Sequence, residues 1–132
     1  TGLPRAKTLY GPLADQLKDA NSFASKLKAM LAVRERYRIH ESEQLDIPVP
    51  RAKGLLVMAH KLPGDGVHGG GVQVTALNFG QTSIDETVSV SAVKAGQGVT
   101  ELLTQASEGK VATGGQVRVR LAPLEAKALL FK

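Results

Sequence analysis

A single amphipathic helix followed only by β-type runs is the feature that most restricts the fold of this chain. The segment NSFASKLKAMLAVRERYR near the start repeats its apolar residues with helical spacing. From Gly54 onward, apolar and polar residues instead alternate with period two, as they do in half-buried antiparallel strands. This order predicts a mainly β fold with one helix in front of it.

The β part, expected over residues 50–132, consists of short runs separated by turn residues. The strand-like runs are GLLVMAHKL, GVQVTALNFG, IDETVSVSAV and VRVRLAPLEAKALLF. In part, LLVMA and LEAKALLF are apolar on both faces, which indicates strands that are covered on both sides. Short strands at this spacing predict an antiparallel Greek-key β-sandwich of about eight strands.

The helix is expected over residues 22–41, after an extended lead-in at residues 1–21. Asn21 or Ser22 can cap it, because a side-chain oxygen at this position accepts a hydrogen bond from a free N–H of the first turn. On one face of the helix, four apolar side chains form what we call the apolar stripe: Phe23, Leu27, Met30 and Leu31. We expect this stripe to face the sandwich or another domain.

Arg34 falls in the centre of the apolar stripe. A guanidinium buried without a partner is costly, so this position predicts a carboxylate or carbonyl group nearby. An ion pair that fixes the helix is the interpretation we favour. A substrate contact is the functional alternative, and a side chain that extends to solvent is the third.

Composition restricts the classes of function. With 132 residues the chain is long enough for one domain with a real core, and it has no cysteine for a disulfide or a thiolate zinc site. The net charge of +5 is dispersed, and three Phe and two Tyr make up all the aromatic residues, so nucleic-acid binding is disfavoured. No apolar run reaches the roughly 18 residues of a membrane span. The lack of cysteine favours a cytoplasmic protein.

No residue pattern predicts catalysis, a metal site or a cofactor. The stretch PGDGVHGGG lacks the Gly-Lys-Ser/Thr ending of a phosphate loop and leads into a strand instead of a helix. The three histidines have no zinc-like spacing, and the carboxylates have the polar neighbours of surface acids. A carbohydrate-binding module is the main alternative, although the chain has no Trp, and Phe79 and Phe131 are better explained as core residues.

Five phrases, taken in order, resemble the last part of α-amylase-family enzymes. SFASKLKAMLAVRERYRIHESEQL resembles their last barrel helix, and GLLVMAHKL is similar to the first strand of their C-terminal domain. QVTALNFGQTSIDETVSV, in which Asn78 and Phe79 end a β-run, looks like the second strand and its turn. VTELLTQASEGKV and VRVRLAPLEAKALLF are similar to the connection and the closing strand that follow.

Within that family, ADQLKDANSFASKLKAMLAVR is most similar to a phrase of trehalose synthases. Asp15, Gln16 and Ser22 match that phrase in kind, whereas Ala20 and Asn21 depart from it. Because the chain also opens in mid-phrase and without Met, we interpret it as a piece of a longer protein.

The resemblance implies a domain with a structural role and no activity of its own. The family's catalytic carboxylates lie on a (β/α)8 barrel upstream of the residues present here, so the implied partner is that barrel in the same parent chain. The parent enzyme would interconvert maltose and trehalose. Without the barrel, part of the apolar stripe would be exposed, and we expect the isolated chain to self-associate.

Overall fold

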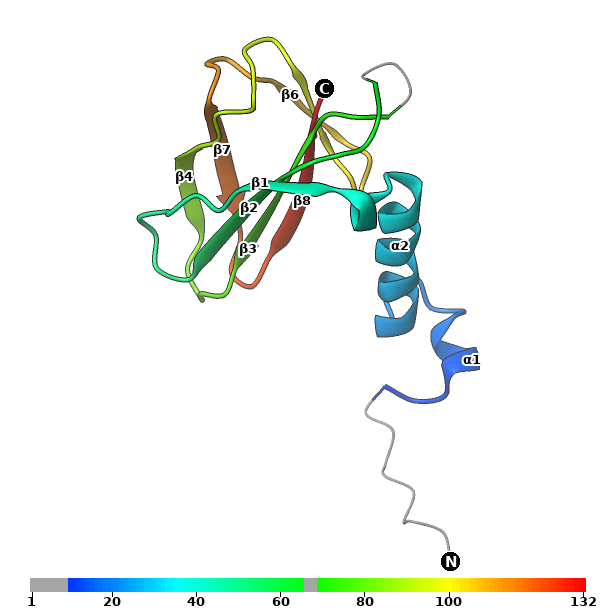
Figure 1. Ribbon diagram of the computed structural model, residues 1–132. Helices are drawn as coiled ribbons and strands as arrows, with labels where there is room; N and C mark the ends of the chain where they lie inside the picture. Colours follow the sequence, from blue (N-terminus) through cyan, green and yellow to red (C-terminus); the bar gives the residue numbers. More distant parts are fainter. Residues whose placement is uncertain (1–9, 66–68) are drawn as a thin grey trace, which may run out of the picture.

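The computed structural model describes residues 10–65 and 69–132. Its helices precede its strands along the chain, as the sequence predicts (Figure 1). The helices are α1 (Leu13–Gln16), α2 (Phe23–Arg36) and the 3-10 helix η1 (Ile39–Glu41). The strands are β1 (Glu43–Asp46), β2 (Leu55–Lys61), β3 (Val72–Asn78), β4 (Ile84–Ser89), β5 (Gly98–Glu101), β6 (Ser107–Lys110), β7 (Gln116–Leu121) and β8 (Ala126–Phe131).

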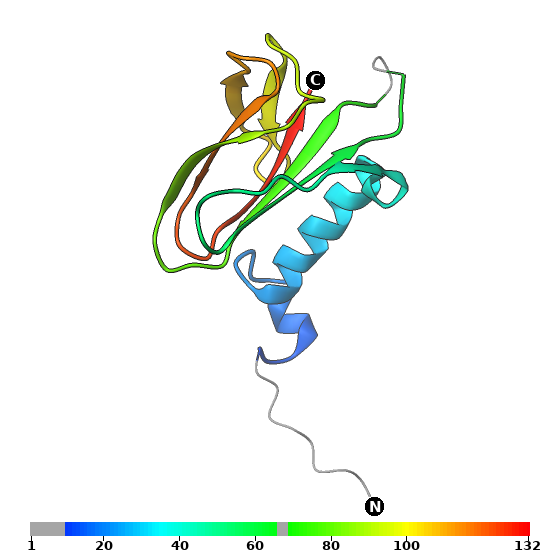
Figure 2. The same ribbon diagram turned by 60° about the vertical axis from the view of Figure 1, so that its left-hand side comes forward.

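The strands form two antiparallel sheets whose apolar faces meet, which gives the β-sandwich architecture. The larger sheet has six strands in the order β1-β2-β3-β8-β5-β6, and β4 pairs with β7 in the smaller one. In Figure 2, β4 (yellow-green) and β7 (orange) lie on the other side of the larger sheet from α2 (light blue). Pairs such as β3 with β8 join strands that are distant in sequence, and Val74 lies opposite Leu129 in that pair.

Period-two alternation places the core between the sheets. In β7, for example, Val117 and Val119 are buried while Arg118 and Arg120 are exposed. Of the two phenylalanines predicted to be core, Phe131 is buried, at 2% exposure. The prediction for Phe79 is wrong: its side chain is 66% exposed because it lies in the turn after β3, where the alternation has ended.

The N-terminal part differs from the sequence-based expectation in two places. The lead-in contains a helical turn, α1, which follows Pro12, a residue whose fixed φ of −62° suits the start of a helix. Residues 1–9 of the lead-in lie outside the described part. The main helix ends at Arg36 and not at residue 41, because Arg38 takes a left-handed conformation with φ of 50° that interrupts helical geometry.

Candidate interaction surface

The apolar stripe of α2 lies on the surface of the structure. Phe23, Leu27, Met30 and Leu31 are 53%, 42%, 54% and 54% exposed. No residue of α2 is buried. The stripe therefore does not pack into the core of the sandwich.

α1 and the residues on either side of it enlarge this apolar surface. Tyr10, Leu13 and Leu17 are also at least half exposed, and the Tyr10 ring stacks on the Phe23 ring with centroids 4.9 Å apart. Between the two helices runs a groove of about 670 Å³, which we call the α1–α2 groove. Its lining residues are Tyr10, Gly11, Leu13, Gln16, Leu17, Phe23, Ala24, Leu27, Lys28 and Leu31.

Hydrogen bonds around Gln16 fix the angle between α1 and α2. Ser22 caps α2, since its hydroxyl oxygen accepts a hydrogen bond from the Ser25 N–H at 3.2 Å. The Gln16 side chain accepts a second one from the Ala24 N–H at 3.2 Å. The Gln16 carbonyl oxygen accepts hydrogen bonds from the hydroxyls of Ser22 and Ser25. The corner between the helices is thus held by polar contacts, which leaves its apolar side chains available.

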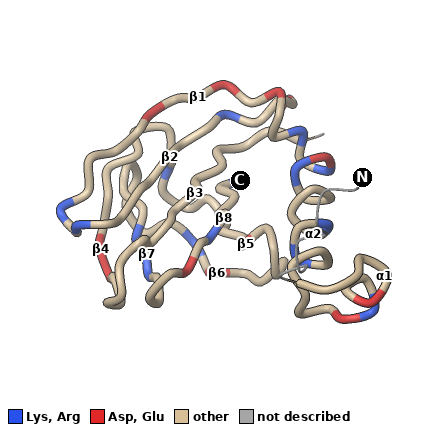
Figure 3. The backbone as a smooth tube through the Cα atoms, turned by 90° about the horizontal axis from the view of Figure 1, so that it is seen from below, with Lys and Arg blue, Asp and Glu red and all other residues tan. Residues whose placement is uncertain are grey.

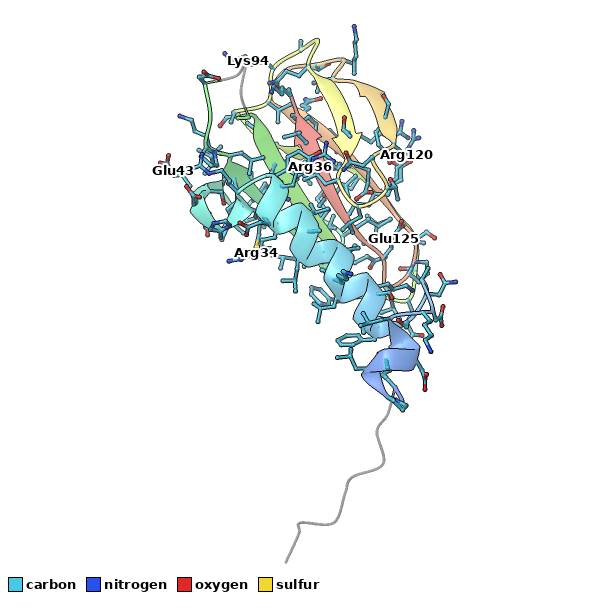
Figure 4. The ribbon with its side chains drawn as sticks, turned by 90° about the vertical axis from the view of Figure 1, so that its right-hand side faces the viewer. Arg34, Arg36, Glu43, Lys94, Arg120 and Glu125 are labelled. Carbon is cyan, nitrogen blue, oxygen red and sulfur yellow. The ribbon has the colours of Figure 1, made fainter. Side chains whose placement is uncertain are left out.

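The sandwich holds α2 mainly at the C-terminal end of the helix. The Tyr37 hydroxyl donates to the Gln105 side chain at 3.1 Å, and the Gln105 amide donates to the Leu102 carbonyl at 2.5 Å. Leu102 is fully buried, so this chain of contacts joins the helix to the core. Figure 4 shows α2 in front of the six-stranded sheet, on the side away from β4 and β7.

Arg34 is exposed, and within the described ranges its guanidinium forms no hydrogen bond or ion pair. The buried partner expected from its position in the stripe is therefore missing, because nothing covers this face of α2. Beyond the end of α2, Arg38 and Glu41 do form an ion pair. Of the three interpretations of Arg34, extension to solvent describes this structure.

Asn78 ends β3 and joins two turns of the sandwich. Its side chain is 3% exposed, and its amide nitrogen donates to the carbonyls of Thr82 and Ala122, both at 2.8 Å. Its amide oxygen accepts from the Gly80 N–H at 2.8 Å. Asn78 thus ties the turn after β3 to the turn between β7 and β8, which is a structural role.

Two carboxylates with structural roles were not singled out by the sequence patterns. Glu101 is 4% exposed, and this burial raises the pKa of its carboxyl group. Hydrogen bonds from the hydroxyl and N–H of Thr104 and from further backbone N–H groups lower the pKa by more. The net shift of the Glu101 pKa is therefore downward. The pKa of Glu86 is also lowered, chiefly by the Arg51 N–H, and the Ala52 N–H donates to the same group. The only sequence signal for Glu101 was an acid three residues before a threonine.

The described ranges contain no group of three His, Cys, Asp or Glu side chains arranged to hold a metal ion. No helix in them combines the length and apolar character needed to cross a bilayer. Both oxygens of the Glu86 carboxylate and of the Glu101 carboxylate accept hydrogen bonds from backbone or hydroxyl donors.

Comparison with known proteins gives a fold and no family. No protein-family model matches the sequence, and no curated protein matches it either. Among solved structures, a Bacillus halodurans protein assigned as an α-N-acetylgalactosaminidase is similar over 88% of this chain, with a TM-score of 0.60 and 13% identity. α-Galactosidase I from Mortierella vinacea is similar over 79%, with a TM-score of 0.54 and 15% identity.

A GH27 β-L-arabinopyranosidase from Geobacillus stearothermophilus is similar to the same extent, with a TM-score of 0.54, 16% identity and 79% of this chain covered. The chain spans about a quarter of the length of these enzymes: 26%, 26% and 23% of the three. The fold seen here is therefore one that forms part of longer glycosidase chains.

Proposed function

We propose that this chain is the non-catalytic C-terminal domain of a glycoside hydrolase and supports the catalytic barrel of the same polypeptide. Support comes from the fold, which takes up about a quarter of the chain in the glycosidases above. The observation that carries the proposal is the apolar surface of α1 and α2, which the sandwich does not cover and which precedes the β domain in the chain.

The barrel would cover the apolar stripe and the α1–α2 groove. Arg34 would then lie in an interface, where a barrel carboxylate is the partner that its charge requires. The sandwich would be of the Greek-key type found at the end of α-amylase-family enzymes. We keep the cytoplasm as the proposed compartment.

The sequence phrases and the structural neighbours favour different parent enzymes. The sequence phrases favour a trehalose synthase, whereas the structural neighbours are α-galactosidase-type glycosidases, and none of the three described is a trehalose synthase. We give more weight to the neighbours, because their likeness covers most of the chain and each of the sequence phrases is short. The structure adds no support for a carbohydrate-binding module. Two of the exposed aromatic rings, Tyr10 and Phe23, stack on each other, so their facing sides are not open to a sugar ring.

The test compares the 132-residue chain with its parent polypeptide. Both are assayed on nitrophenyl α-galactoside, nitrophenyl α-N-acetylgalactosaminide, nitrophenyl β-L-arabinopyranoside and maltose. The parent is expected to turn over one of these substrates, and the isolated chain none of them. Turnover by the isolated chain, or a parent without a barrel-type sequence upstream, would overturn the proposal.

A paired variant tests the role of the apolar stripe in that parent. Replacing Leu27 and Leu31 by Ser should lower the Tm of the parent by several degrees, because an apolar interface is lost. The control is Phe79→Ser, which removes an exposed apolar side chain outside the stripe, from the turn after β3. An unchanged Tm in the paired variant would mean that the barrel does not cover the stripe.

A further inference from the structure

The two sheets leave free strand edges beside one another at one side of the sandwich. β6 is the last strand of the six-stranded sheet, and β7 pairs only with β4 in the smaller sheet. In the part of the chain that the structure describes, backbone hydrogen bonds of residues 117–121 join them to no strand except β4. Residues 107–110 likewise pair only with β5. Free edges of this kind offer unpaired N–H and C=O groups to an added strand.

A cleft of about 380 Å³ lies between these edges, and we call it the β6–β7 cleft. Five consecutive residues of β7, from Gln116 to Arg120, line it. Since successive side chains of a strand point to opposite faces, this continuous lining means that the backbone edge of β7 borders the cleft. The apolar floor comes from three other strands and includes Val99, Leu129 and Phe131.

The rim of the cleft carries more positive than negative charge. Its cations are Lys110, Arg118, Arg120 and Lys127, and Figure 3 shows the basic positions along β7. The acids near them are Glu108, which pairs with Lys127 at 3.0 Å, and Asp85, which Arg118 contacts through two 2.7 Å hydrogen bonds.

The two remaining cations of the rim have weaker ion pairs or none with described residues. Arg120 lies 3.5 Å from the Asp85 carboxylate, which Arg118 already occupies, and Lys110 has no ion pair with a described residue. Four cations against two carboxylates leave an excess of two positive charges around an apolar floor.

We propose that the β6–β7 cleft binds an extended acidic peptide segment that adds a strand to the free edge of β7. Alternate apolar side chains of the segment would lie on the floor, and the acidic side chains between them would meet Lys110 and Arg120. Backbone pairing supplies the affinity in this mode, and the charges select the partner. The other free edge of the larger sheet, β1, has the sequence EQLD, so its charge disfavours the same ligand.

The experiment measures fluorescence anisotropy of a labelled peptide, acetyl-Glu-Val-Glu-Val-Glu-Val-Glu-amide, with the full 132-residue chain. Saturable binding is expected, together with NMR shift changes at Arg118 to Arg120 and none at Glu43 to Asp46. The same peptide with Lys for Glu, or with N-methyl groups on the valines, should bind at least about tenfold more weakly, because charge attraction or strand pairing is lost.

Charge-reversal variants locate the site without touching the core. Lys110→Glu combined with Arg120→Glu should weaken binding roughly tenfold, since two rim attractions become repulsions. Lys94→Glu, an exposed lysine that does not line the cleft (Figure 4), is the matched control and should bind as the unaltered chain does. Equal binding of the N-methylated peptide, shifts confined to β1, or binding of dextran sulfate but not of the peptide would each overturn the proposal.

Discussion

At the scale of single residues, buried polar side chains hold the turns of this sandwich together. Asn78 makes three hydrogen bonds to backbone groups of two turns, one of which is 44 residues away in sequence. Glu101 has the same function for the segment after β5, where it accepts hydrogen bonds from Thr104 and from the Ala128 N–H of β8. Removal of either side chain leaves backbone groups without hydrogen-bond partners, and an unpaired polar group inside a protein lowers the free energy of unfolding.

Asn78→Ala should lower the free energy of unfolding by about 2–3 kcal/mol, because the carbonyls of Thr82 and Ala122 lose their donor in a buried site. Urea denaturation followed by circular dichroism measures this difference. The matched control is Gln81→Ala, which removes a side-chain amide from an exposed position of the same turn. Equal effects of the two substitutions would contradict the role assigned to Asn78.

Glu101 should make folding stability depend on pH. Its pKa in the folded protein is below the usual range, so the ionised form stabilises the fold above the pKa of the unfolded chain, and this contribution is lost as the pH falls through the folded pKa. The difference in unfolding free energy between the unaltered chain and Glu101→Gln should therefore be larger at pH 7 than at pH 3. A difference that does not change with pH would mean that Glu101 is not held as a carboxylate.

At the scale of elements, the strands and the helix depend on different sources of stability. The long strands of the larger sheet bury alternate side chains in the core, as Val57 and Val74 show. α2 buries none, and 14 residues are few for a helix that stands without tertiary packing. Its cap at Ser22 and its contact with Gln105 through Tyr37 are its main supports.

Native-state hydrogen exchange should consequently show different rates for the amides of α2 and those of the strands in the larger sheet. Amides in the middle of α2, such as those of Leu27 to Leu31, are expected to exchange much faster than those of Val74 and Ala76 in β3, because local opening of the helix exposes no core. Mass spectrometry of peptic fragments or NMR gives the rates. Equal protection of α2 and β3 would show that the helix and the sandwich unfold as one unit.

At the scale of the whole molecule, the apolar surface of α1 and α2 governs the solution behaviour of the isolated chain. The stripe together with Tyr10, Leu13 and Leu17 forms a continuous apolar area on one side of the sandwich. Areas of this kind associate with one another when their partner is absent. The polar corner at Gln16 holds the two helices in a fixed arrangement, which favours a defined complex.

Light scattering coupled to size-exclusion chromatography should therefore detect dimers or larger species of the 132-residue chain. Leu27→Ser combined with Leu31→Ser should shift the distribution toward monomer, whereas Phe79→Ser, which lies outside the stripe, should not. A monomer at high concentration for the unaltered chain would show that the exposed stripe does not drive association.

The sequence determined the elements of this protein and, through them, its fold class. Helical spacing identified α2, and period-two alternation identified β2, β3, β4, β7 and β8, because both periods follow from the backbone geometry of a single segment. The strands β1, β5 and β6 were missed. EQLD and SEGK are short edge strands that bury no side chain, and β5, GVTE, has only four residues, too few to show a clear alternation.

What the tertiary structure decided is which residues lie together. The pairing of β3 with β8, the three hydrogen bonds of Asn78 and the exposure of Arg34 all depend on how distant segments meet, and no local pattern records that. The β6–β7 cleft is of the same kind, since its floor and rim come from six strands and the link between two of them. Local spacing fixes the shape of one segment, whereas packing between segments fixes the surfaces on which function depends.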